Sequence, residues 1–362
     1  MMDIKHSLID KMPAVMAGTE GADTRVIDSV ISYEEVWACT TCYACVDQCP
    51  VGNNHVDAII DMRRAYVLSE SKFPTELQNT YKNMENNSNP WGVGAHQRAD
   101  WAKGLDVKIM GKLDKPEDVE YLYWVGCAGS FDERNKKISR ALVNVLNHAK
   151  VDFAILGEQE TCTGDSARRS GNEYLYQTMA TGNVELFNNY KVKKVITGCP
   201  HCFNTIKNEY PQFGGNYEVI HHSQLITNLI ADGKIKVDPT KNTDLGQVTL
   251  HDACYLGRYN GEFDAPRSVI ENAIGKPSVD IEKSKSESMC CGAGGAQMWM
   301  EEHVGDRVNV TRTNQLLEAK PNTIATNCPF CITMVSDGIK AKPEASNVKV
   351  LDIAEIIESS LV

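Results

Sequence analysis

The feature that most constrains this chain is a set of cysteines that repeats within it. Cys127 corresponds to Cys254 and Cys202 to Cys331, at offsets of 127 and 129 residues. A repeat of this length indicates two similar domains and not a solenoid of short units. All thirteen cysteines fall into three groups: Cys39, Cys42, Cys45 and Cys49; Cys127, Cys162, Cys199 and Cys202; and Cys254, Cys290, Cys291, Cys328 and Cys331.

The composition favours metal ligands over disulfides for these cysteines. Charged residues at 23% and hydrophobic residues at 42% are ordinary for a soluble globular protein, which excludes the disordered and fibrous classes. The chain has no uncharged apolar run of about 18 residues, so we expect no transmembrane helix. Residues 1–6 carry charges where a signal peptide is apolar, so we expect a cytoplasmic protein. A net charge of −11 without a basic segment argues against nucleic acid and anionic lipid as partners. Clustered cysteines in a protein that is not exported are more often metal ligands.

Hydrophobic patterns predict that strands and helices alternate in both copies. The first copy shows a strand ending at Cys127, a helix over Ile138–Ala149, and strands near residues 151–156, 192–197 and 217–220, with helices between them. The second copy repeats this order. Alternation at this spacing predicts a mainly parallel sheet in each copy. The cysteines then follow the strand ends, which is the edge where open α/β sheets bind ligands.

The part before the copies has a different pattern. Apolar residues at helical spacing predict one helix from Val56 to Val67 and another from Pro74 to Met84. The predicted fold class is therefore α/β, with a small helical ferredoxin-like head followed by two duplicated α/β cysteine-rich domains. The predicted boundaries are 1–87 for the head, 88–118 for a linker, 119–240 for the first cysteine-rich domain and 241–362 for the second.

The head contains the cysteine spacing of bacterial ferredoxins, from Cys39 to Cys49 followed by Pro50. Three thiolates two residues apart can surround one corner of a [4Fe–4S] cube, and the alternatives are zinc or simple packing. In two-cluster ferredoxins the fourth cysteine of such a run binds the other cluster. This chain contains no second run. Either Cys49 completes its own cluster, or a partner chain supplies the other run and the two exchange ligands.

The third group provides five cysteines, which is one more than a zinc ion or a cubane cluster uses. The adjacent residues Cys290 and Cys291 must point in different directions. We therefore predict a larger or opened iron–sulfur assembly at this group. Backbone N–H groups of the glycine-rich segment 292–295 are expected to approach the cluster sulfides. A phosphate-binding loop at 292–295 and a disulfide between the paired cysteines are the alternatives.

The second group has the same frame with one difference. Thr163 stands where the second cysteine of the pair stands in the later copy. The four thiolates that remain suit either a [4Fe–4S] cluster or zinc. The two sites have therefore diverged, and only the later one keeps five ligands.

The polar neighbours of the two sites differ as well. His251 occupies the position of Trp124 in the first copy. His251 is a candidate catalytic residue that delivers protons at the five-cysteine site. Arg258 and Arg267 are candidates for offsetting the charge of a cluster. The alternatives are hydrogen bonds around the site and surface ion pairs.

From about residue 31 to its C-terminus, the sequence resembles the heterodisulfide-reductase-like iron–sulfur proteins with duplicated cysteine-rich CCG domains. The family pattern of a cysteine, a Cys-Cys-Gly and a Cys-x-x-Cys is complete in the third group. The stretches Glu160–Arg169, Trp37–Cys42, Asp61–Arg64 and Asn89–Gly92 are similar to the membrane-associated branch, which links electron-transfer flavoprotein to a quinone. The resemblance implies a noncubane [4Fe–4S] cluster at the five-cysteine site.

This resemblance implies an iron–sulfur electron-transfer subunit of an oxidoreductase complex. It would pass electrons between a flavoprotein and a membrane quinone-linked partner. Relatives in that branch also carry a membrane cytochrome-like region and an earlier ferredoxin run. We expect a partner subunit to supply both and to hold the chain at the inner membrane.

Three alternatives to this function stay open. The first is a disulfide reductase that acts at the noncubane cluster with His251 as proton donor, although Thr163 puts the family's two-site disulfide catalysis in doubt. The second is the iron–sulfur subunit of a lactate or glycolate oxidase. The third is a zinc-bound scaffold.

Overall fold

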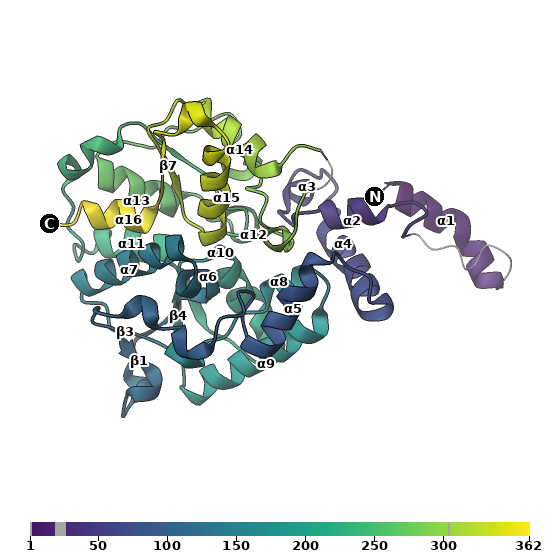
Figure 1. Ribbon diagram of the computed structural model, residues 1–362, viewed down its shortest axis with the longest axis horizontal. Coiled ribbons are helices and arrows are strands. Elements are labelled where there is room, and N and C mark those ends of the chain that lie inside the picture. The colour runs from purple at the N-terminus through teal and green to yellow at the C-terminus, as the bar shows by residue number, and fades with distance from the viewer. Residues whose placement is uncertain (1, 19–26, 303–304) are drawn as a thin grey trace.

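The N-terminal part of the chain is helical. The computed structural model describes residues 2–18, 27–302 and 305–362, and α1 lies at one end of the molecule, beyond α2 (Figure 1). Asn54 caps α4 by accepting a hydrogen bond from the backbone N–H of Asp57 at 3.2 Å. The predicted helix up to Val67 is confirmed, with its last turn in π-helical form over Ala65–Ser69. The helices are α1 (Met2–Ala17), α2 (Tyr33–Ala38), α3 (Ala44–Asp47), α4 (His55–Arg64) and α5 (Glu76–Asn87).

The first cysteine-rich domain is built on a parallel sheet with strand order β1-β3-β2-β4-β5. Residues 108–109, inside the predicted linker, form β1 and extend this sheet at its edge. The strands are β1 (Lys108–Ile109), β2 (Tyr121–Trp124), β3 (Phe153–Ile155), β4 (Lys194–Thr197) and β5 (Glu218–His221). The helices are α6 (Gly126–Phe131), α7 (Glu133–His148), α8 (Asp165–Arg169), α9 (Glu173–Asn189), α10 (Pro200–Asn204) and α11 (His222–Ala231).

The second cysteine-rich domain has a smaller parallel sheet with strand order β6-β7-β8. Its strands are β6 (Val248–Leu250), β7 (Thr323–Thr326) and β8 (Lys349–Asp352). Its helices are α12 (Gly257–Asn260), α13 (Asp264–Ile274), α14 (Val308–Leu317), α15 (Pro329–Lys340) and α16 (Ile353–Ser359). The α/β fold class predicted from the sequence is confirmed, and every pairing between these strands is parallel.

The second copy does not repeat the order of the first completely. Its described residues contain no strand equivalent to β3, and the corresponding segment makes one backbone hydrogen bond to the sheet, from Val279 N to Val248 O at 2.8 Å. In the first copy this strand is the buried run Phe153–Ile155, whereas in the second copy Val279 lies between Ser278 and the charged Asp280, and Pro277 lacks an N–H group. A segment with so few apolar side chains gains little from burial as a strand.

The two domains share one hydrophobic core. Helices α7 and α11 of the first domain pack with α13 and α16 of the second, and the four lie on one side of the molecule (Figure 1). Val143, Ile226, Ile270 and Ile357 are fully buried there. Removal of this apolar surface from water holds the domains together. Pro329 and Phe330, which begin α15 after β7, also line the pocket at the ends of β2 and β4, so the two strand edges that bear the cysteines lie next to each other.

Candidate metal centres

The four cysteines of the first domain line one buried pocket at the ends of β2 and β4. The sequence predicted that the strand ends at Cys127, which is wrong. β2 ends at Trp124 and Cys127 lies in α6, because Gly126 turns the chain at a φ of +76°. Cys199 precedes α10, and Cys202 lies in the first turn of that helix. Thr163 lines the same pocket, with its hydroxyl 3.9 Å from the sulfur of Cys202. The structure thus brings together all four predicted ligands of this site.

A buried arginine from the predicted linker contacts this site. Arg98 Nη2 donates hydrogen bonds to Cys127 Sγ at 3.3 Å, to Glu160 Oε1 at 3.0 Å and to Thr161 O at 2.9 Å. Glu160 also accepts from two backbone N–H groups that follow β2. Burial opposes ionisation of Cys127, but hydrogen bonds from Cys162 and Arg98 outweigh it and lower its pKa to about 7. This favours the thiolate, the form that binds metal.

The five cysteines of the second domain also gather in one place. Cys290 and Cys291 are buried free cysteines whose thiols interact with each other. That the two side chains point in different directions stays a prediction. The Cys290 thiol interacts with that of Cys254, and the Cys291 thiol interacts with that of Cys331. Cys328 precedes α15 and its thiol interacts with that of Cys331. The donor chemistry of both sites, thiols converging in a buried space, suits iron–sulfur clusters or zinc.

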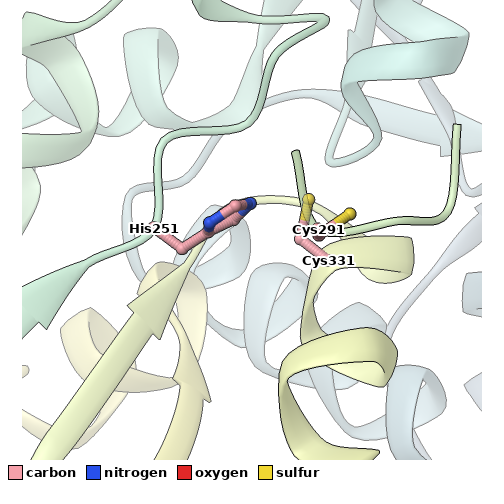
Figure 2. A group of neighbouring side chains, drawn as sticks. All are labelled: His251, Cys291 and Cys331. Carbon is pink, nitrogen blue, oxygen red and sulfur yellow. The ribbon is translucent and has the colours of Figure 1, made fainter. Parts of the chain in front are cut away.

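His251, the predicted proton donor, lies beside the five-cysteine site. One of its ring nitrogens and the sulfurs of Cys291 and Cys331 lie within 4.8 Å of one another (Figure 2). The other side of the ring meets Arg312, whose Nε lies 3.1 Å from His251 Nδ1. Burial and the positive charge of Arg312 lower the pKa of His251 to about 3. The imidazole is therefore neutral at neutral pH, and its role as proton donor stays a prediction.

The head places its cysteines against the second domain. The Cys42 thiol interacts with that of Cys290, which together with burial raises the pKa of Cys42. Cys45 is exposed to solvent. Partial burial of its thiol and the nearby thiols of Cys39 and Cys42 raise its pKa. The sulfur of Cys49 accepts hydrogen bonds from nearby backbone N–H groups, which lower the pKa of this thiol.

The glycine-rich segment 292–295 has two functions in the structure. Gly292 N donates a hydrogen bond to Cys290 Sγ at 3.3 Å. The approach of these N–H groups to cluster sulfides stays a prediction. A Cβ at Gly294 would lie 2.3 Å from the oxygen of Thr40, and the backbone of the head passes equally close to Gly295. These two glycines are therefore required for close contact between head and second domain.

Two arginines, the buried Arg63 and the half-buried Arg258, complete this contact. Arg63 is fully buried and donates to Cys39 O at 2.6 Å and to Gly295 O at 2.9 Å. Arg258 donates to Cys42 O at 2.7 Å. Arg267 forms ion pairs with Asp252 and Asp280, as the alternative interpretation predicts.

The three cysteine sites form one continuous series. Cys42 of the head interacts with Cys290 of the five-cysteine site. Cys328 of that site interacts with Cys199 of the four-cysteine site. The five-cysteine site therefore lies between the other two, although it comes last along the chain.

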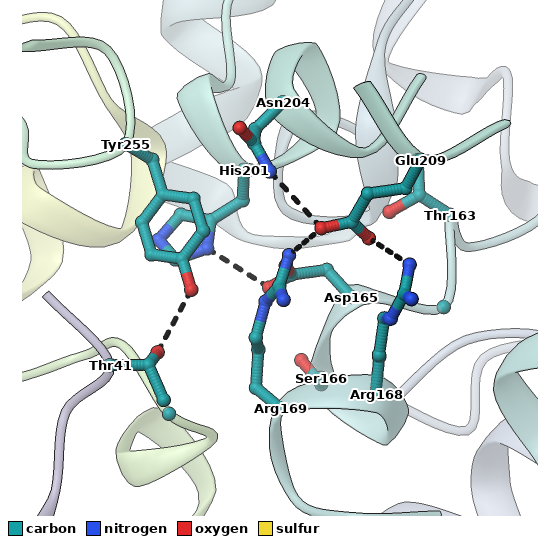
Figure 3. A network of polar contacts seen from close by, with 12 residues as sticks. Thr41, Thr163, Asp165, Ser166, Arg168, Arg169, His201, Asn204, Glu209 and Tyr255 are labelled. Carbon is teal, nitrogen blue, oxygen red and sulfur yellow. Dashed lines mark hydrogen bonds and ion pairs between the residues drawn. The ribbon is translucent and has the colours of Figure 1, made fainter. Parts of the chain in front are cut away.

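A buried charged network lies beside the four-cysteine pocket (Figure 3). Asp165 Oδ2 lies 2.9 Å from His201 Nδ1, and Asp165 Oδ1 accepts from Arg169 Nε at 3.0 Å. Glu209 pairs with Arg169 and with Arg168. Burial opposes ionisation of Asp165, but His201 and Arg169 outweigh it and lower its pKa to about 2. The network fixes His201, which stands between two cysteines in the sequence.

Tyr255 connects this network to the other two parts of the molecule. Its ring stacks on that of His201 with centroids 4.0 Å apart, and its hydroxyl lies 2.8 Å from Thr41 Oγ1 in the head (Figure 3). Tyr255 follows Cys254 directly in the sequence. The sequence did not predict roles for Tyr255 and Arg98. Arg98 is far from every cysteine in the sequence, and Tyr255, although it follows Cys254, belongs to no recognised ligand motif.

Comparison with known proteins agrees with the duplication. A family model described as a cysteine-rich domain, CCG, matches residues 121–207 and again residues 248–336. These two matches contain every cysteine of the second and third groups. Among the described residues, none of the helices has both the length and the apolarity needed to cross a membrane.

Three relatives show how far the similarity extends. EtfAB:quinone oxidoreductase of Syntrophomonas wolfei is 48% identical over 338 residues, which are 91% of this chain and 47% of that protein. The probable iron-sulfur-binding oxidoreductase FadF of Bacillus subtilis is 42% identical over 370 residues, 99% of this chain and 52% of that protein. A dihydromethanophenazine:CoB--CoM heterodisulfide reductase polypeptide of Methanosarcina barkeri is 31% identical over 335 residues, 91% of this chain and 78% of that protein. The chain thus spans about half the length of the first two relatives and more than three quarters of the third.

Proposed function

The chain belongs to the heterodisulfide-reductase-like iron–sulfur proteins with duplicated cysteine-rich domains, and we propose that it is the electron-transfer subunit of an oxidoreductase complex. In this role it passes electrons between a flavoprotein and a membrane quinone-linked partner. The observation that supports it most is the continuous series of three cysteine sites, in which a thiol of each outer site interacts with a thiol of the five-cysteine site. The name of the Syntrophomonas wolfei relative, EtfAB:quinone oxidoreductase, supports the choice of partners.

Each site holds one iron–sulfur cluster under this proposal. Clusters bound by thiolates supply one-electron transfer, with potentials tuned by hydrogen bonds to their sulfurs. The four-cysteine site takes a [4Fe–4S] cluster and the five-cysteine site takes the noncubane [4Fe–4S] cluster. The head cluster is held by Cys39, Cys42 and Cys45 with a fourth ligand, for which Cys49 is the candidate in this chain.

The head is the part that faces the electron partner. The nine cysteines of the two cysteine-rich domains are buried, whereas Cys45 is exposed. Val51, next to this run, is 75% exposed and offers an apolar contact. Cys49 Sγ accepts a hydrogen bond from Asn53 N at 3.3 Å. A ferredoxin run on the partner is the alternative source of the fourth ligand, as in two-cluster ferredoxins.

Anaerobic purification tests the proposal directly. Three clusters predict well over four irons per chain, a brown sample, and EPR signals from three sites after reduction. Co-purification or mixing with a flavoprotein donor is expected to reduce these sites. About four irons per chain or fewer would refute the proposal, because most of the series would then be missing.

A disulfide reductase that acts at the five-cysteine site is the second candidate. The specific observation in its favour is His251 beside Cys291 and Cys331, in a chain similar to the heterodisulfide reductase polypeptide of Methanosarcina barkeri. It predicts that the reduced protein cleaves a low-molecular-weight disulfide. The absence of turnover with any such disulfide, in protein that retains its iron, counts against this candidate.

A further inference from the structure

We propose that each cysteine-rich domain directs one fixed ring N–H group at the last cysteine of its own site, from Trp124 to Cys202 and from His251 to Cys331. The inference rests on the proposed function, because these donors act on clusters held by the thiolates. Arg312 is the positioning residue that holds His251 in the donating form. In the first domain no such residue is needed, since an indole nitrogen can only donate.

The duplication places the two rings at equivalent positions. Trp124 ends β2 three residues before Cys127, and His251 follows β6 three residues before Cys254. In each domain the neighbouring parallel strand leads into a helix whose first turn contains the last cysteine. The ring at the end of β2 therefore lies beside the cysteine in the first turn of α10, which follows β4. In the same way, the ring after β6 lies beside the cysteine in the first turn of α15, which follows β7.

In the first domain the donor is an indole. Trp124 is completely buried, and its Nε1 has no hydrogen-bond partner within the part of the chain that the structure describes. A Cβ placed at Gly126 would lie 3.5 Å from Cys202 Sγ and 4.0 Å from Trp124 Nε1, so the sulfur and the nitrogen border the same small space. Buried N–H groups are almost always paired. The acceptor that this one lacks is sulfur at the four-cysteine site.

In the second domain the donor is an imidazole whose tautomer is determined by its neighbour. The guanidinium of Arg312 has only donors, and its Nε lies 3.1 Å from His251 Nδ1. Nδ1 must therefore accept, so the ring hydrogen is on Nε2. Nε2 is on the far side of the ring, which points at the sulfurs of Cys291 and Cys331 (Figure 2). Arg312 is fully buried and is itself held by Gln315 and by a main-chain carbonyl.

A fixed N–H group near cluster sulfur has a defined effect. Reduction adds negative charge to the sulfurs, and a hydrogen bond stabilises that charge. The donor therefore raises the reduction potential of its own site. This role differs from that of the proton donor predicted from the sequence, because the ring keeps its hydrogen while the electron arrives.

The test is an EPR-monitored redox titration of the whole chain with its clusters in place. His251→Phe removes the donor at the five-cysteine site, and Trp124→Phe removes it at the four-cysteine site. Each change is expected to disfavour reduction of its own site about tenfold, since hydrogen bonds to charged groups have about this strength. Tenfold corresponds to about 59 mV for one electron. The other site serves as the internal control and keeps its potential.

Two further variants separate the N–H group from the ring. His251→Gln retains an N–H donor and is expected to recover part of the lost potential. Arg312→Ala leaves the imidazole in place but frees its tautomer, so the potential of the five-cysteine site is expected to fall as in His251→Phe. Should His251→Phe lose its cluster, Arg312→Ala still measures the same contact.

Three outcomes overturn the inference. The first is unchanged potentials in His251→Phe and Arg312→Ala with full iron content. The second is a shift at both sites in either single-ring variant. The third is loss of iron from the five-cysteine site in both His251→Phe and His251→Gln while Arg312→Ala keeps its iron, which would make His251 a ligand. Failure of the proposed function itself is distinguished by low iron in the unaltered protein.

Discussion

Replacing Gly294 by alanine tests how closely the head must approach the second domain. The new Cβ would lie 2.3 Å from the carbonyl oxygen of Thr40, about 1 Å inside the 3.4 Å at which ordinary contact begins. The obstructing atom belongs to the backbone and not to the end of a flexible side chain, so the head itself has to move. The backbone at Gly294 does not have a positive φ, and the substitution therefore tests the contact alone.

The size of the effect follows from Arg63, which joins the two parts. It donates to Cys39 O at 2.6 Å and to Gly295 O at 2.9 Å, and about 1 Å of separation takes either contact beyond hydrogen-bond range. The loss of one such charged hydrogen bond costs about 1.5–3 kcal/mol. The free energy of opening the head is expected to fall by that amount. The equilibrium constant for opening therefore rises about ten- to hundredfold.

Hydrogen exchange of the anaerobically purified protein measures this opening. Amides of α2 and α4 are expected to exchange faster in Gly294→Ala, while those of α7 and α16 keep their rates. Gly182→Ala is the matched control, because Gly182, like Gly294, has no positive φ but has nothing within 4 Å of the added Cβ. Normal exchange of the head in Gly294→Ala, or equally fast exchange of the head in Gly182→Ala, would refute the close contact.

Three other predictions address the first domain. Arg98→Met leaves the buried carboxylate of Glu160 without its cation and is expected to lower the free energy of unfolding by about 3–5 kcal/mol in guanidinium titrations. The double variant Arg98→Met/Glu160→Gln is expected to recover most of the lost stability. An equal loss of stability in the single and the double variant contradicts the pairing. Thr163→Cys restores the fifth cysteine, and the EPR spectrum of the first site is expected to become similar to that of the second; an unchanged spectrum contradicts the idea that this residue causes the difference. The pKa of Asp165 is about 2, below its ordinary 3.8, so its stabilising effect is complete above about pH 4 and is lost as the pH falls toward 2. Asp165→Asn is therefore expected to lower the free energy of unfolding by about 2 kcal/mol in urea at neutral pH, and a difference that changes between about pH 8 and pH 5 would contradict the assigned pKa.

Much of the fold was predictable because its signals are local. The order of strand, cysteine and helix in each copy depends on apolar spacing over a few residues, and the positions of β4, β5 and α7 follow it closely. The missing strand of the second copy was not predicted, because the duplication was extended to residues 276–283 without regard to their low apolar content. β1 was not predicted either, since two residues are too few to show a period.

The candidate sites divide in the same way. The sequence by itself determined the three groups of ligands and the divergence at Thr163, because cysteine spacing and the comparison of two copies are visible along the chain. Only the tertiary structure decided that the five-cysteine site lies between the other two, that Arg98 reaches Cys127, and that Arg312 fixes the imidazole of His251. These contacts join segments that are far apart in sequence. Their formation depends on how the head and the two sheets pack together, and residue spacing carries no information about that packing.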